Sequence, residues 1–132
     1  MSSILSETQR VAWTLDARIP LLVTEDAAAL AVALSAGPRA AVLAVAPASA
    51  LPVGAVVLGS FDAAQSHAVA CACCGGRLPA ATALDRLFQA RVHGQCPWFD
   101  RVVALAATAE ARAAIAAALV EDAVTAARFR GV

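Results

Sequence analysis

Three cysteines lie within four residues of this 132-residue chain: Cys71, Cys73 and Cys74 stand directly before a glycine pair at 75–76. Thiolates bind soft metal ions, and a glycine pair lets the backbone bend around a bound ion. A loop of this kind can present two or three sulfur ligands to one ion. Because Zn²⁺ takes four ligands in a tetrahedron, the spacing predicts a soft-metal site, with zinc as the first candidate.

The fourth ligand of such a site must come from outside the cluster. His67 stands four residues upstream, and Cys96, close to His93, follows the next predicted helix. A partner chain could also supply this ligand. The candidate metal ligands of this chain are therefore Cys71, Cys73, Cys74, Cys96 and His67.

Other roles for the cysteines compete with metal binding. Free cysteine is often a small buried hydrophobe, but successive strand residues face opposite sides, so Cys73 and Cys74 cannot both enter one core. Thiol redox chemistry is a third role. An enzymatic role ranks last, because the chain has no nucleophile-elbow motif. It would use Cys96 or Cys74 as the nucleophile and His93 or His67 as the base. We therefore expect no enzymatic activity.

The charged residues exclude several functions. All ten basic residues are arginine, so the chain cannot form a phosphate-binding loop that ends in Gly-Lys-Thr, nor a lysine Schiff base. Ten acidic residues balance the arginines. With zero net charge and no basic stripe, nucleic-acid binding has little electrostatic support.

The elements that must position the cysteines follow an alternating pattern. Short apolar runs predict buried strands, and Ala-rich stretches with stop and capping signals predict helices between them. Thr24 is the expected N-cap of the first helix, and Thr108 that of the last. The strands are expected at 19–23, 41–45, 55–58 and 102–105, and the helices at 27–36, from Pro79 to near Gly94, and from Thr108 through Arg128, with a loop at 60–76 between the third strand and the second helix.

This pattern is typical of an α/β domain with a short, mainly parallel sheet. We expect one such domain at 18–132, preceded by an N-terminal arm or helix at 1–17. The charge-free stretch 40–61 is long enough to span a bilayer, but Pro47, Pro52, Gly54 and Gly59 divide it, which favours two strands.

The N-terminus carries charges and lacks a continuous apolar region, so it does not resemble a secretory signal. We expect a cytoplasmic protein with no membrane association. In a reducing compartment, cysteines are more often thiols or metal ligands than disulfides.

Four short segments together carry a family resemblance. They are an opening strand at 18–24 (RIPLLVT), the cysteine motif at 71–78 (CACCGGRL), a strand entry at 99–103 (FDRVV) and the final residues 128–132 (RFRGV). In order and approximate spacing they resemble the CobW-like metallochaperone GTPases, P-loop proteins of cobalamin biosynthesis and zinc homeostasis. The resemblance implies a three-layer P-loop-NTPase-like fold, and it implies that Cys71, Cys73 and Cys74 bind the cargo metal.

The chain departs from the family where nucleotide would bind. In place of a Gly-rich loop it has Thr24-Glu25-Asp26-Ala27-Ala28, and two carboxylates at a helix N-terminus would repel a triphosphate. The magnesium-site segment would align with 104–110, where Thr108 and Glu110 are the polar residues. We therefore expect a degenerate, nucleotide-independent pseudo-GTPase domain that binds zinc and no nucleotide.

An alternative function is a non-catalytic interaction module with neither nucleotide nor metal. The chain stops before the next strand of the family, which would leave an open sheet edge. Because an apolar edge tends to be covered by a second copy, a homo-oligomer or a complex with a partner protein is expected.

Overall fold

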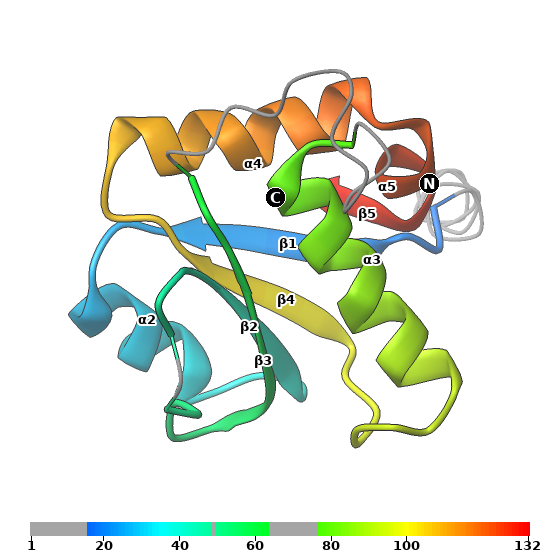
Figure 1. Ribbon diagram of the computed structural model, residues 1–132. Coiled ribbons are helices and arrows are strands. Elements are labelled where there is room, and N and C mark those ends of the chain that lie inside the picture. Colours follow the sequence, from blue (N-terminus) through cyan, green and yellow to red (C-terminus); the bar gives the residue numbers. More distant parts are fainter. Residues whose placement is uncertain (1–15, 49, 64–76) are drawn as a thin grey trace, which may run out of the picture.

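The computed structural model describes residues 16–48, 50–63 and 77–132. Their strands form one five-stranded sheet in the order β3-β2-β4-β1-β5, and every pairing is parallel (Figure 1). The strands are β1 (Ile19–Thr24), β2 (Ala40–Val45), β3 (Ala55–Phe61), β4 (Arg101–Leu105) and β5 (Phe129–Gly131). The helices are α2 (Ala27–Leu34), α3 (Pro79–Val92), α4 (Ala109–Glu121) and α5 (Ala123–Arg128).

The helices cover both faces of the sheet, which makes three layers. On one face, Leu30 and Leu34 of α2 pack against Ala40, Val42 and Val103. The opposite face carries α3, α4 and α5, whose buried residues pack on the strand residues at alternate positions, among them Leu21, Ala41, Leu43, Val102 and Ala104. Alternate strand residues face opposite sides, so short apolar runs can fill both layers. The predicted α/β class with a parallel sheet is confirmed.

The charge-free stretch 40–61 forms β2 and β3, as its proline and glycine residues predict. Strand β3 extends through Phe61, three residues beyond the expected end, because Phe61 is buried in the core. In the parts of the chain that the structure describes, no helix combines the length and apolar character needed to cross a bilayer.

The cap of the first helix differs from the prediction. Asp26, not Thr24, is the N-cap of α2, and its carboxylate accepts a hydrogen bond of 2.7 Å from the amide of Ala29. Thr24 is the last residue of β1, and its hydroxyl donates to the Ala104 carbonyl at 2.6 Å. Strand β1 therefore extends one residue further than expected, and two residues separate it from the start of α2.

The C-terminal helix is also different, because it breaks at Asp122. The Asp122 carboxylate accepts from the Thr125 amide at 3.0 Å and starts α5, in which Thr125 is buried. After α5 the chain forms β5, where Phe129 pairs with Ile19 of β1. The final residues therefore pair with the first half of β1, and Phe129 is buried in the core, so that β3 and β5 are the edge strands of the sheet.

Candidate functional site

The sheet has a reversal of strand order between β1 and β4. After β1 the chain passes along the α2 face to β2, whereas after β4 it passes along the other face, through α4 and α5, to β5. The two connections leave neighbouring strands in opposite directions. In open parallel sheets, ligands bind outside the carboxyl ends of the strands at such a point.

Side chains and backbone groups of the protein itself span the reversal point between β1 and β4. The Thr24 hydroxyl donates to the Ala104 carbonyl, and the Ala106 amide donates to the Thr24 carbonyl at 2.8 Å. Arg112 donates to the Ala106 carbonyl at 3.1 Å and lies 3.4 Å from the Glu25 carboxylate. The crevice is thus bridged by a buried hydrogen bond and by a surface ion pair.

The helices that follow β1 and β4, which are α2 and α4, are each capped by a side chain at the N-terminus. Only Glu25 and Asp26 connect β1 to α2, and the Asp26 carboxylate occupies the helix N-terminus, where an anion would otherwise bind. The predicted cap of α4 is confirmed, because the Thr108 hydroxyl accepts from the Ala111 amide at 3.1 Å.

An apolar cavity of about 380 Å³ lies beside Thr108 at the same edge. It opens at the carboxyl ends of β2 and β4. Apart from the Thr108 hydroxyl, the side chains around it are aliphatic, so it offers little chemistry of its own: Ala44, Val45, Pro47, Ala48, Leu105, Ala107 and Thr108.

The predicted metal ligands Cys71, Cys73, Cys74 and His67 lie outside the described residues. The described chain leaves the sheet after Phe61, at the carboxyl end of β3, and is described again from Arg77, just before α3 begins at Pro79. Helix α3 packs on β3 and returns to the amino end of the sheet, where β4 begins. Phe61 is thus at the carboxyl edge, whereas Arg77 lies beside Asp122 at the far end of α4, a helix that begins at the carboxyl edge and runs toward the amino edge (Figure 1).

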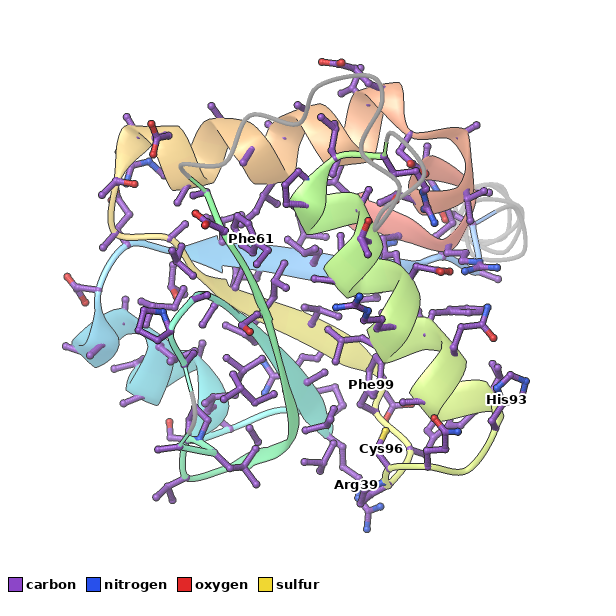
Figure 2. All side chains as sticks on the ribbon, viewed as in Figure 1. Arg39, Phe61, His93, Cys96 and Phe99 are labelled. Carbon is purple, nitrogen blue, oxygen red and sulfur yellow. The ribbon has the colours of Figure 1, made fainter. Side chains whose placement is uncertain are left out.

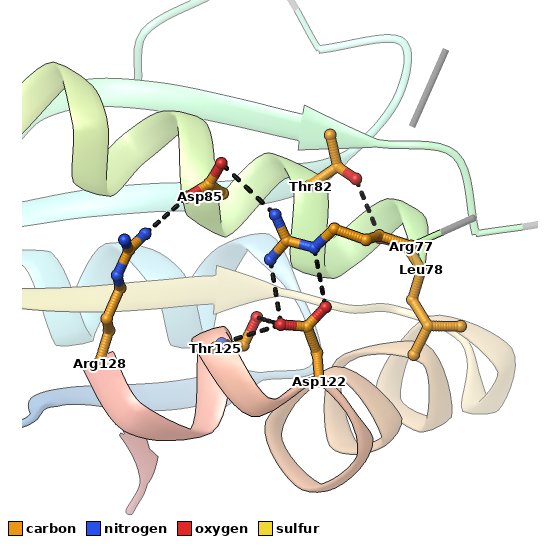
Figure 3. Close-up of polar contacts among 7 residues, drawn as sticks. All are labelled: Arg77, Leu78, Thr82, Asp85, Asp122, Thr125 and Arg128. Carbon is orange, nitrogen blue, oxygen red and sulfur yellow. Dashed lines mark hydrogen bonds and ion pairs between the residues drawn. The ribbon is translucent and has the colours of Figure 1, made fainter. Parts of the chain in front are cut away.

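Arg77 is held by a network of four charged side chains (Figure 3). Its guanidinium donates to both oxygens of Asp122, at 2.9 and 3.0 Å, and lies 3.5 Å from Asp85, which also pairs with Arg128. The hydrogen bonds from Arg77 lower the pKa of Asp122 to about 2. The network ties the start of α3 to the break between α4 and α5.

Sequence reasoning missed this network. Asp85 and Arg128 belong to two separate helices, whose sides turn toward each other in the fold. The one local signal is the spacing Asp122-x-x-Thr125, which is typical of an N-cap. Nothing local predicts a partner 45 residues away.

Cys96 and His93 lie at the far end of α3 from Arg77 (Figure 2). Cys96 is half-buried against the main core, and burial raises the pKa of its thiol. His93 is the exposed C-cap residue of α3. Within the described ranges, no three His, Cys, Asp or Glu side chains gather closely enough to hold a metal ion.

The chain was compared with protein families, curated proteins and solved structures. No protein-family model, no curated protein and no solved structure matches this chain.

Proposed function

We propose that this protein is a nucleotide-independent, CobW-like pseudo-GTPase domain that binds a soft metal ion, zinc first among them, through Cys71, Cys73 and Cys74. The observation that carries the proposal is the presence of three thiols within four residues, next to two glycines. Packing alone does not account for such a cluster, whereas a metal ion uses all three sulfurs at once.

The position of the cysteine segment in the fold supports this function. The segment follows Phe61, the last residue of β3, which is at the carboxyl edge of a parallel sheet, the edge where α/β proteins bind their ligands. Arg77 is held by two hydrogen bonds to Asp122. A fixed exit from the segment lowers the conformational entropy that the loop loses when it closes around an ion.

The same geometry favours His67 over Cys96 as the fourth ligand. Cys74 precedes Arg77 by three positions, and three residues span at most about 11 Å. Helix α3 has 14 residues and is therefore about 21 Å long, and Cys96 lies beyond its far end. Its raised thiol pKa also disfavours the thiolate that a metal needs. We assign Cys96 to core packing.

Two features support a domain that works without nucleotide. The Asp26 carboxylate occupies the N-terminus of α2, with Glu25 beside it, at the position that a triphosphate would need. The chain also has no lysine to contact the β- and γ-phosphates.

Elemental analysis of the full chain, purified without an affinity tag, tests the proposal. We expect about one equivalent of zinc per chain, as for a single closed site. The double variant C71S/C73S should lose it, and the matched control C96S should keep it. Metal-free wild-type protein would contradict the proposed function, and loss of zinc from C96S would contradict the assignment of Cys96 to packing.

A further inference from the structure

A second cavity, of about 470 Å³, lies at the opposite, amino-terminal edge of the sheet. It lies open to solvent between the start of β1, one side of α3 and the end of α5. Three of its lining residues are arginines and one is acidic, in a chain whose net charge is zero. Its wall consists of Asp16, Ala17, Arg18, Ile19, Phe88, Arg91, Ala127 and Arg128.

The single carboxylate in the wall is already engaged. Arg18 donates to both oxygens of Asp16, at 3.0 and 2.9 Å, and its remaining terminal nitrogen donates to the Ala126 carbonyl at 3.2 Å. Arg130 lies 3.8 Å from the same carboxylate. Asp16 therefore neutralises none of the charge on the other two arginines of the cavity.

Among the three arginines of the cavity wall, Arg91 has the least charge compensation. Its Nε donates to the Phe99 carbonyl at 2.9 Å, and its guanidinium stacks on the ring of Trp98, with 3.7 Å to the ring centroid. In the described part of the chain it forms no ion pair within 4 Å, and its two terminal nitrogens donate no hydrogen bond. Burial lowers the pKa of Arg91, although the more distant Asp100 opposes that effect. A guanidinium stays protonated even so, which leaves an uncompensated positive charge.

Arg128 contributes a second set of donors. One terminal nitrogen pairs with Asp85, and the guanidinium lies over the ring of Phe88, with 4.1 Å to the centroid. Its Nε and its other terminal nitrogen donate to no described residue. Phe88 is itself part of the cavity wall, so an aromatic surface adjoins these donors.

We propose that this cavity binds an organic oxyanion, with its carboxylate or phosphate group against Arg91 and Arg128 and its apolar body against Phe88 and Ile19. Planar guanidinium forks match the oxygens of both groups, and an anion in this cavity would compensate the charge that the fold leaves on Arg91. None of the residues that line this cavity belongs to the cysteine segment, although Arg128 of the cavity and Arg77, which follows that segment, both pair with Asp85.

Titration calorimetry on the full chain, with phenyl phosphate and benzoate as probes, tests this site. We expect saturable binding that weakens as salt is added, whereas neutral benzyl alcohol gives no heat and inorganic phosphate, which lacks the apolar body, binds at least tenfold more weakly. The preferred probe separates a phosphate ligand from a carboxylate ligand. Absence of binding by both aromatic anions at millimolar concentration would overturn the proposal.

Variants locate the binding. R91Q and R128Q should each weaken phenyl phosphate binding by tenfold or more, because each removes a charge-assisted contact. R91K keeps the charge and the long side chain, but it should also weaken binding because an ammonium lacks the two-pronged donor geometry. The matched control is R86Q, which removes an exposed arginine from the same helix outside this cavity and should bind as wild type does. Equal losses in R86Q and R91Q would overturn the site, provided that thermal unfolding shows both variants folded.

Discussion

The Arg77 guanidinium and the Asp122 carboxylate, 45 residues apart in the chain, meet through two N–H···O hydrogen bonds of 2.9 and 3.0 Å. Asp122 also accepts from the Thr125 amide at 3.0 Å, so one carboxylate both starts α5 and holds the residue before α3. This pair joins the flank of the cysteine segment to the last two helices (Figure 3). The contact therefore fixes the residue that follows the cysteine segment to the C-terminal part of the fold.

Substitution of Asp122 should separate its two roles. In D122N the amide oxygen can still cap α5, but the ion pair with Arg77 is lost, so the free energy of unfolding should fall by about 1–2 kcal/mol. D122A loses the cap as well and should cost about 1 kcal/mol more. Urea denaturation measures both values. If D122N and D122A unfold at the same urea concentration, the capping role of Asp122 is wrong.

The same carboxylate should make stability depend on acid pH. The pKa of Asp122 is about 2 in the folded protein, below the value of about 3.9 for an unfolded chain. The contribution is therefore complete above about pH 5 and is lost as the pH falls toward 2; for this largely buried group it is on the order of 2 kcal/mol. Urea denaturation at a series of pH values should show a smaller acid loss in D122N than in wild type.

Asp16 provides the control for this pH dependence. Its pKa is also lowered to about 2 by hydrogen bonds from Arg18, but the pair is exposed to solvent and screened. D16N should therefore keep most of the acid loss of the wild type. If D16N abolishes the loss of stability at acid pH and D122N leaves it intact, then the titrating group is Asp16, and the prediction for Asp122 is wrong.

Gly59 allows α3 to pack closely on β3. A Cβ at this position would lie 3.0 Å from Cγ of Leu87, and within 3.2 Å of both its methyl groups, so G59A should cost about 1–3 kcal/mol through overpacking. L87A alone should cost about 2–4 kcal/mol through the cavity it leaves. Together the two changes should cost less than their sum, because the new methyl group enters the space that Leu87 vacates. Strictly additive values from urea denaturation would contradict this contact.

Local patterns in the chain were enough to predict the strands β1 to β4, the helices α2 and α3, and the start of α4. The apolar runs at 19–23 and 41–45 are β-strands because alternate residues can enter two layers, and Thr108 caps α4 because its hydroxyl reaches the Ala111 amide three residues away. These interactions extend over a few residues, so composition and spacing carry the information. The cysteine cluster is a feature of the same local kind, and its chemistry remains the basis of the proposed function.

Tertiary packing decided what local patterns left open. Asp122 breaks the last helix because Arg77 and Thr125 both bind its carboxylate, and Phe129 turns the final residues into β5 because its ring is buried in the core beside β1. The separation of Cys96 from Arg77 by the whole length of α3, and the meeting of Arg91 and Arg128 at one cavity, are also products of helix placement. Sequence spacing alone determined which thiols stand together. Contacts between side chains far apart in the sequence depend on how the helices cross the sheet. The placement of the helices depends in turn on the packing of the whole core.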